Sequence, residues 1–162
     1  MTSKLLVDSI EGRTTSGFLT PDRPAFKAYH SVASGAHQEV THNTYVILPL
    51  NATDFNIGGH FNTSTYKFTA PTGGIYYFYA QVYQDKAGGI RYVAIYKGST
   101  NVARSQSQSS TNDDATATVS QLLQLNAGDT VCSYVYHATD TSSSYYTGGD
   151  GSYTYFMGYL VG

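Results

Sequence analysis

The chain is 162 residues long, carries a formal net charge of −2 and contains only 12% charged residues, about half the share usual in globular proteins. Its nine Lys and Arg residues are scattered, whereas a nucleic-acid-binding surface needs them clustered, so the composition argues against nucleic acid as a partner. No apolar run approaches the roughly 18 residues of a membrane span, and Leu5-Leu6-Val7 is too short for the apolar core of a signal peptide.

The first 23 residues differ in character from the rest. Lys4–Ile10 has the pattern of one short strand, and residues 11–22 form a linker by composition, rich in Gly, Thr and Ser. Pro24 then opens a domain that we predict to span residues 24–162, after an attachment segment and linker over residues 1–23.

The domain reads as all-β. Tyr and Thr, which favour strands, are abundant, and turn signals recur every 8–14 residues without a helical pattern. Besides the segment discussed next, we predict strands over residues 25–31, 44–50, 90–97, 102–106, 116–125, 130–137 and 153–161. Within 90–97, Val93 and Ile95 are expected on one face, with Arg91 and Ala94 on the other. The regular spacing of the turn signals predicts a sandwich or jelly roll.

Residues 75–82 are the most informative stretch. On a strand, Tyr76, Phe78, Ala80 and Val82 face one way, and residues 75, 77, 79 and 81 face the other. A strand that is apolar on both sides suits a domain core on one side and an oligomer interface on the other. The candidates for core or trimer interface are Tyr76, Tyr77, Phe78, Tyr79 and Tyr159.

Seven short motifs occur in order along residues 24–162. They are Pro24-Ala-Phe26, Asn56-Ile-Gly58 with Phe61-Asn62, Lys67-Phe-Thr-Ala-Pro71, Gly74-Ile-Tyr-Tyr-Phe78, Val93–Gly98 and Gly128-Asp129, followed by the closing Phe156-Met-Gly-Tyr-Leu160. Together they resemble the globular head of the complement C1q and tumour-necrosis-factor superfamily. The resemblance implies a ten-strand jelly roll that assembles as a homotrimer.

The start of the chain resembles a different group of proteins. Lys4–Ile10 followed by a Thr/Ser/Gly linker is similar to the beginnings of tailed-phage virion and fibre proteins, where such a segment serves for attachment. The resemblance implies that the side chains of Leu5, Leu6, Val7 and Ile10 contact other virion proteins.

The loops at one end of the sandwich are the candidate binding surface. Residues 138–151 read as a long Ser/Thr/Gly loop, where the rings of Tyr145 and Tyr146 have no core to fill and are suited to contact a host glycan or protein. Because consecutive strands alternate in direction, this loop, which also holds Asp150, is expected beside the loop over residues 107–114 that holds Asn112.

We expect no cofactor and no catalytic activity. The resemblance to the C1q and tumour-necrosis-factor superfamily implies a candidate calcium ligand at Asp113-Asp114, close to where some family members place one, and the alternative is a solvated turn. No nucleophile elbow, phosphate-binding loop or dinucleotide fingerprint is present. The lone Cys132 reads as an inert buried thiol.

The sequence therefore predicts a non-enzymatic virion protein. It would be made in the host cytoplasm and exposed on the particle as a trimeric knob or fibre that contacts the host surface. Two alternatives remain open: a purely structural head decoration or tail joint, and a secreted bacterial C1q-like lectin or adhesin.

Overall fold

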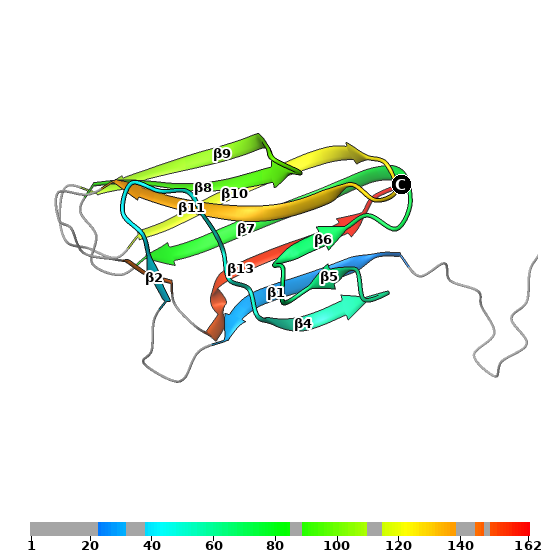
Figure 1. The fold of residues 1–162 in the computed structure, drawn as a ribbon, viewed down its shortest axis with the longest axis horizontal. Helices are drawn as coiled ribbons and strands as arrows, with labels where there is room; N and C mark the ends of the chain where they lie inside the picture. Colours follow the sequence, from blue (N-terminus) through cyan, green and yellow to red (C-terminus); the bar gives the residue numbers. More distant parts are fainter. Residues whose placement is uncertain (1–22, 32–37, 85–88, 110–114, 139–144, 148–149) are drawn as a thin grey trace, which may run out of the picture.

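The computed structural model describes residues 23–31, 38–84, 89–109, 115–138, 145–147 and 150–162, and these form two packed antiparallel β-sheets (Figure 1). The described residues contain no helix, so none of them forms a helix that could cross a membrane.

The first sheet has seven strands. Six of them follow the order β2-β12-β7-β13-β1-β4, and the seventh, β10, pairs with β7 outside this order. The strands are β1 (Ala25–Ser31), β2 (Gln38–Val40), β4 (Ala52–Ile57), β7 (Gly74–Gln84), β10 (Ala115–Leu125), β12 (Tyr145–Thr147) and β13 (Asp150–Leu160).

The second sheet has six strands. Their order is β5-β6-β11-β8-β9, and β3 pairs with β11 beyond the end of β6. The strands are β3 (Val46–Ile47), β5 (Phe61–Asn62), β6 (Lys67–Thr69), β8 (Gly89–Lys97), β9 (Thr100–Ser109) and β11 (Thr130–Ala138).

This architecture confirms the predicted all-β sandwich. Thirteen strands lie in the described residues rather than ten, and the five shortest have two or three residues each. The strand predicted over 44–50 is reduced to Val46–Ile47, although Leu48 and Leu50 beyond it are buried. The strand predicted over 102–106 extends over Thr100–Ser109, because the whole segment pairs with β8.

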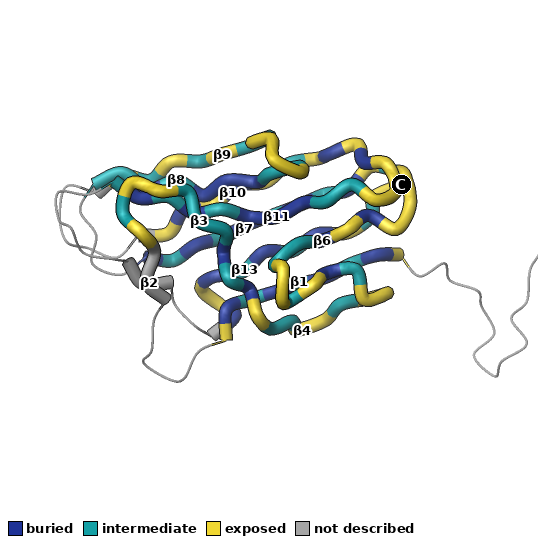
Figure 2. Tube along the Cα trace, viewed as in Figure 1, coloured by how far each residue is buried: buried dark blue, intermediate teal, exposed yellow. Residues whose placement is uncertain are grey.

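Aromatic rings from both sheets form the centre of the core. The ring of Phe26 on β1 stacks on Phe61 and Phe68 of the six-stranded sheet, with centroid distances of 4.8 and 5.1 Å. It also meets the edge of Phe156 at 5.2 Å, and Phe156 stacks on Phe78 at 5.7 Å. All five side chains are buried. Figure 2 shows buried positions recurring along the strands of both sheets. Offset and edge contacts of this kind stabilise a core beyond the area that they bury.

The alternation predicted for residues 75–82 is confirmed, and β1 alternates in the same way. On β1, Phe26, Ala28 and His30 point inward, and on β7 the inward side chains are Tyr76, Phe78, Ala80 and Val82.

The face predicted for Arg91 is wrong. Arg91 is 1% exposed and lies on the inner face with Val93 and Ile95, because side chains two residues apart share one face of a strand. Ala94, on the opposite face, is also buried.

The sandwich has two distinct ends. At the end that we call the base, the Leu160 N–H donates to the Pro24 carbonyl and the Ile75 N–H donates to the Gly162 carbonyl. The C-terminus and the start of β1 therefore lie together (Figure 1). The opposite end is called the apical end. There the strand pairing ends at residue pairs such as Gln84 with Ala115 and Ile90 with Ala138.

Replacement of Gly158 by Ala tests the packing of the core. A Cβ atom at Gly158 would lie 2.5 Å from the Phe78 ring and 3.0 Å from the Tyr77 carbonyl oxygen. Since a buried ring and a strand backbone cannot move aside cheaply, we expect Gly158→Ala to lower the free energy of unfolding by about 2 kcal/mol, measured by urea denaturation.

Gly73→Ala is the matched control. Its Cβ would meet only the Leu125 carbonyl oxygen, at an ordinary 3.6 Å. This change is expected to alter stability by less than about 1 kcal/mol. Equal effects of the two substitutions would contradict the assigned role of Gly158.

Candidate interaction surfaces

The outer face of the seven-stranded sheet carries a continuous apolar row near the base. Strand register places Leu122 beside Tyr77, Tyr77 beside Tyr159, and Tyr159 beside Ala25, which pairs with Ile57. Leu122 is 58% exposed, and Tyr159 and Ile57 are close to half exposed. The row thus crosses five strands with no charged side chain.

Tyrosine pairs continue this face toward the apical end. Side chains of β7 and β13 meet as Tyr77–Tyr159, Tyr79–Tyr155 and Tyr83–Tyr153, with ring centroids 5.1–5.7 Å apart. Burial, and then the neighbouring Tyr155, raise the pKa of Tyr79. The Lys27 ammonium lies 5.1 Å from the Tyr155 ring centroid and 2.6 Å from the Asp54 carboxylate. Only these two charges interrupt the described part of the face near its centre.

The apolar side chains on this face are suited to an interface. Each of the large apolar side chains found exposed among the described residues belongs to the seven-stranded sheet or directly follows its strand β13. They are Phe55, Ile57, Ile75, Leu122, Tyr153, Tyr159 and Val161. A contiguous patch of this kind on one side of a small domain is typical of protein contact sites.

The five residues predicted for core or trimer interface separate into two groups. Tyr76 and Phe78 are fully buried in the core, and the Tyr76 hydroxyl donates to the Thr72 carbonyl at 2.9 Å. Tyr77, Tyr79 and Tyr159 lie on the outer face. The second face of β7 is therefore not buried within one chain.

The predicted loop over 138–151 is wrong for Tyr145 and Tyr146. Both lie on β12, where Tyr145 pairs with Val40 and Tyr146 pairs with Glu39. Pairing with β2 satisfies backbone groups that a loop would leave to water. Asp150 begins β13 and pairs with Ser31. Asn112, Asp113 and Asp114 lie outside the described residues, so the calcium hypothesis stays a prediction.

Sequence reasoning missed a group of buried polar side chains toward the apical end. Arg91 and His137 are neighbours across β8 and β11, and both are at most 1% exposed, as is Gln84 on the other sheet. His30 is also buried, and burial lowers its pKa. Arg91, Val93 and Ile95 are spaced two residues apart and therefore share one face of the strand. This spacing is the sequence signal that could have identified Arg91 as buried.

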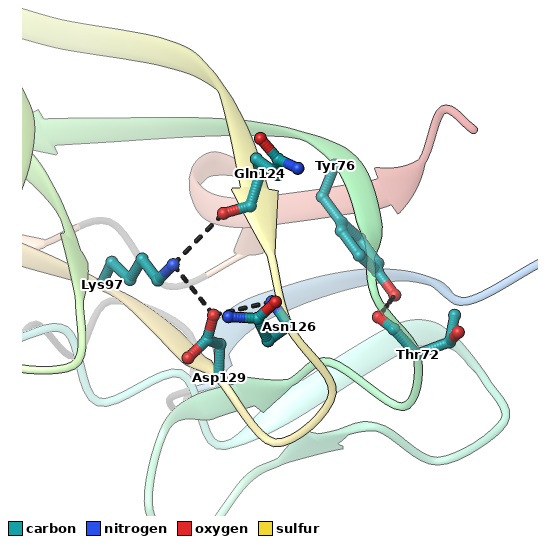
Figure 3. A network of polar contacts seen from close by, with 6 residues as sticks. All are labelled: Thr72, Tyr76, Lys97, Gln124, Asn126 and Asp129. Atoms are coloured by element: carbon teal, nitrogen blue, oxygen red, sulfur yellow. Dashed lines mark hydrogen bonds and ion pairs between the residues drawn. The ribbon is translucent and has the colours of Figure 1, made fainter.

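Three motifs far apart in sequence meet at the base. Lys97 pairs with Asp129 at 2.8 Å and donates to the Gln124 carbonyl at 3.2 Å, and the Asn126 N–H donates to the same carboxylate (Figure 3). The Ala70 N–H donates to the Asp129 carbonyl, and the Ala70 carbonyl accepts from the Gly128 N–H. These contacts join turns of the scaffold, and they form no open site.

The side chains that could hold a metal do not cluster in the part of the chain that the structure describes. No cluster of three or more His, Cys, Asp or Glu side chains that could hold a metal is found there. Cys132 is buried, and burial raises the pKa of its thiol to about 11, which leaves it protonated and poorly nucleophilic.

Comparison with known proteins places this fold among related structures. A family model described as the C1q domain matches residues 25–161. The globular domain of zebrafish complement 1qA superimposes with a TM-score of 0.63 at 17% identity, covering 86% of this chain and 98% of its own. Murine APRIL gives 0.64 at 9% identity, covering 86% and 99%.

Eiger, a tumour necrosis factor from S. frugiperda, gives a TM-score of 0.63 at 13% identity, covering 87% of this chain and 94% of its own. At such low identities these structures show a shared fold alone. A search of curated protein sequences finds no match.

The Lys97–Asp129 pair predicts a specific response to pH. Hydrogen bonds from Lys97 and Asn126 lower the pKa of Asp129 below its ordinary 3.8. A carboxylate with a lowered folded pKa stabilises the fold above that ordinary value, and the contribution is lost as the pH falls through the folded pKa. We expect Asp129→Asn to lower the melting temperature by a few degrees near neutral pH and by progressively less below pH 3.8.

Lys97→Met is the partner control. It should lower the melting temperature in the same direction, and the double variant should lose less than the sum of the two single losses. A difference between wild type and Asp129→Asn that persists in acid would contradict this assignment.

Proposed function

Because the chain belongs to the C1q domain family, we propose that it is a non-enzymatic, homotrimeric binding module carried on the surface of a phage particle. The trimer would present its apical end to the host, and the base would face the particle.

The observation that most directly supports a homotrimer is the apolar outer face of the seven-stranded sheet. Its exposed row from Leu122 through Tyr159 to Ile57 is apolar, and a closed three-fold arrangement would cover the same face in every copy. Tyrosine suits such a contact, since its ring packs while its hydroxyl hydrogen-bonds across the interface. Lys27 and Asp54 already neutralise each other at 2.6 Å, so they would enter the interface as a pair.

The arrangement of the ends supports an outward-pointing module. The described chain enters the domain at the base, beside Gly162, so a segment that precedes Arg23 joins the domain at that end. Leu5, Leu6, Val7 and Ile10 belong to this preceding segment and are its candidates for attachment to other virion proteins. The strand ends next to Tyr145, Tyr146 and Asn112 lie at the opposite end.

Binding would gain its strength from multiplicity. Three equivalent sites in a trimer, and many trimers on one particle, convert later contacts into intramolecular events at high effective concentration. Weak individual contacts by Tyr145, Tyr146, Asp150 or Asn112 would then suffice for adhesion. No bond-making chemistry is part of this proposal.

Localisation on purified particles tests the virion assignment. Gold-labelled antibodies against the domain should mark particles at the end that adsorbs to cells. Labelling of the head alone, with no binding of the isolated domain to host cells, would favour the structural decoration. Absence from particles together with export from bacteria would favour the secreted lectin.

Light scattering coupled to size exclusion tests the trimer separately. We expect a mass three times the 17.6 kDa of one chain. Leu122→Asp would place three like charges in an apolar contact, and it should shift the species to single-chain mass at micromolar concentration.

Gln106→Asp is the control for this variant, because Gln106 is exposed on the six-stranded sheet. It should leave the trimer intact. A wild-type protein that elutes with the mass of one chain would overturn the interface assignment.

A further inference from the structure

The outer face of the six-stranded sheet carries a second group of tyrosines, which the proposed trimer leaves uncovered. Five half-buried rings form this group, here called the outer tyrosine cluster: Tyr45, Tyr92, Tyr96, Tyr134 and Tyr136. The two outer faces lie on opposite sides of the sandwich, since the inner faces of both sheets form one core.

The rings of the outer tyrosine cluster hold one another in place. Tyr45, just before β3, lies 4.8 Å from Tyr136 and 6.3–6.4 Å from Tyr92 and Tyr96. Tyr96 and Tyr134 are 4.4 Å apart. The Tyr136 hydroxyl donates to the Asn43 side-chain oxygen at 3.2 Å. Rings fixed in this way lose little further freedom when a ligand binds.

A cation is fixed over the cluster. The Arg104 guanidinium on β9 lies 5.1 Å from the centroid of the Tyr92 ring. A hydrogen bond with Tyr45, and then the charge interaction with it, raise the pKa of Arg104. The Tyr92 ring and the hydrogen bond with Tyr45 hold the guanidinium over the cluster, and its remaining donors match the oxygens of a carboxylate or sulfate.

The rest of this face has the same sign of charge. Lys67 on β6 lies close enough to Cys132 on β11 for its charge to act on the thiol. The strands of the six-stranded sheet contain no Asp or Glu at all. Asp129 lies just before β11, and its carboxylate is paired with Lys97. An anionic ligand would therefore meet attraction and no opposing carboxylate from these strands.

The polar side chains on this face favour a sugar over a protein as the ligand. The exposed large apolar side chains among the described residues belong to the other sheet or directly follow it, whereas the neighbour of Arg104 on this face is the exposed amide Gln106. Rings with polar tips, amides and hydroxyls suit a hydrated ligand rich in hydroxyl groups. Sugar C–H groups, which carry partial positive charge, rest favourably on the negative faces of aromatic rings.

We propose that the outer tyrosine cluster and Arg104 bind an acidic glycan, with sugar rings against the tyrosines and a carboxylate or sulfate group on the guanidinium. The site lies within a single chain, on the outer face of the six-stranded sheet. It therefore stands whether or not the chain is trimeric or belongs to a virion.

Titration calorimetry with a hexamer of galacturonic acid tests the proposal. Its methyl ester serves as the neutral probe of the same sugar, and hexaglutamate serves as an anion of similar charge without sugar rings. We expect the wild-type protein to prefer the acidic hexamer over both. Arg104→Gln should weaken binding of the acidic hexamer by about tenfold or more and remove the preference over the ester.

Arg23→Gln is the matched control. Arg23 is also an exposed arginine, but it lies just before β1 of the seven-stranded sheet. It should bind the acidic hexamer as the wild type does, and circular dichroism should show both variants folded. The proposal is overturned if the wild type gives no binding heat with the hexamer, if Arg104→Gln binds equally well, or if hexaglutamate binds as tightly.

Discussion

The packing of the Phe26 ring between the two sheets is the contact on which the rest of the structure depends. Phe26 comes from β1, yet its stacking partners Phe61 and Phe68 belong to the other sheet. Phe78 and Phe156 complete the group from β7 and β13. The motifs that run through the whole sequence thus meet at one place. Gly158 belongs to the same arrangement, because only a residue without a side chain leaves room for the Phe78 ring.

With the inner positions occupied by this core, the outer positions of the two sheets are free to differ. Both outer faces use tyrosine, but their neighbours decide what each can do. Tyr77 lies beside exposed Leu122 in a row without charge, which favours a dry contact with another copy. Tyr92 lies beneath Arg104 on a sheet without Asp or Glu, which favours a hydrated anion. The same residue type therefore implies two different partners.

Local pattern was enough to predict the strands whose faces differ clearly. The alternation of β7 follows from the side-chain period of two, and it separated Tyr76 and Phe78 from Tyr77 and Tyr79. The place of Tyr145 on a strand depends on pairing with Val40, about a hundred residues earlier, which local composition does not reveal. The outer tyrosine cluster was missed for the same reason, since Tyr45, Tyr92 and Tyr136 meet only after three strands pair.

The contacts at the base explain why family membership identifies the scaffold better than the ligand. Ala70, Lys97 and Asp129 come from three of the motifs that carry the family resemblance. Their hydrogen bonds connect turns at the base, where the described chain starts and finishes. Such turns constrain the backbone whatever the domain binds. The surfaces argued to bind lie elsewhere, on the outer faces and toward the apical end, where a side chain can change without disturbing Phe26 or the base. A shared fold at 9–17% identity is therefore expected to preserve the core while the partners differ.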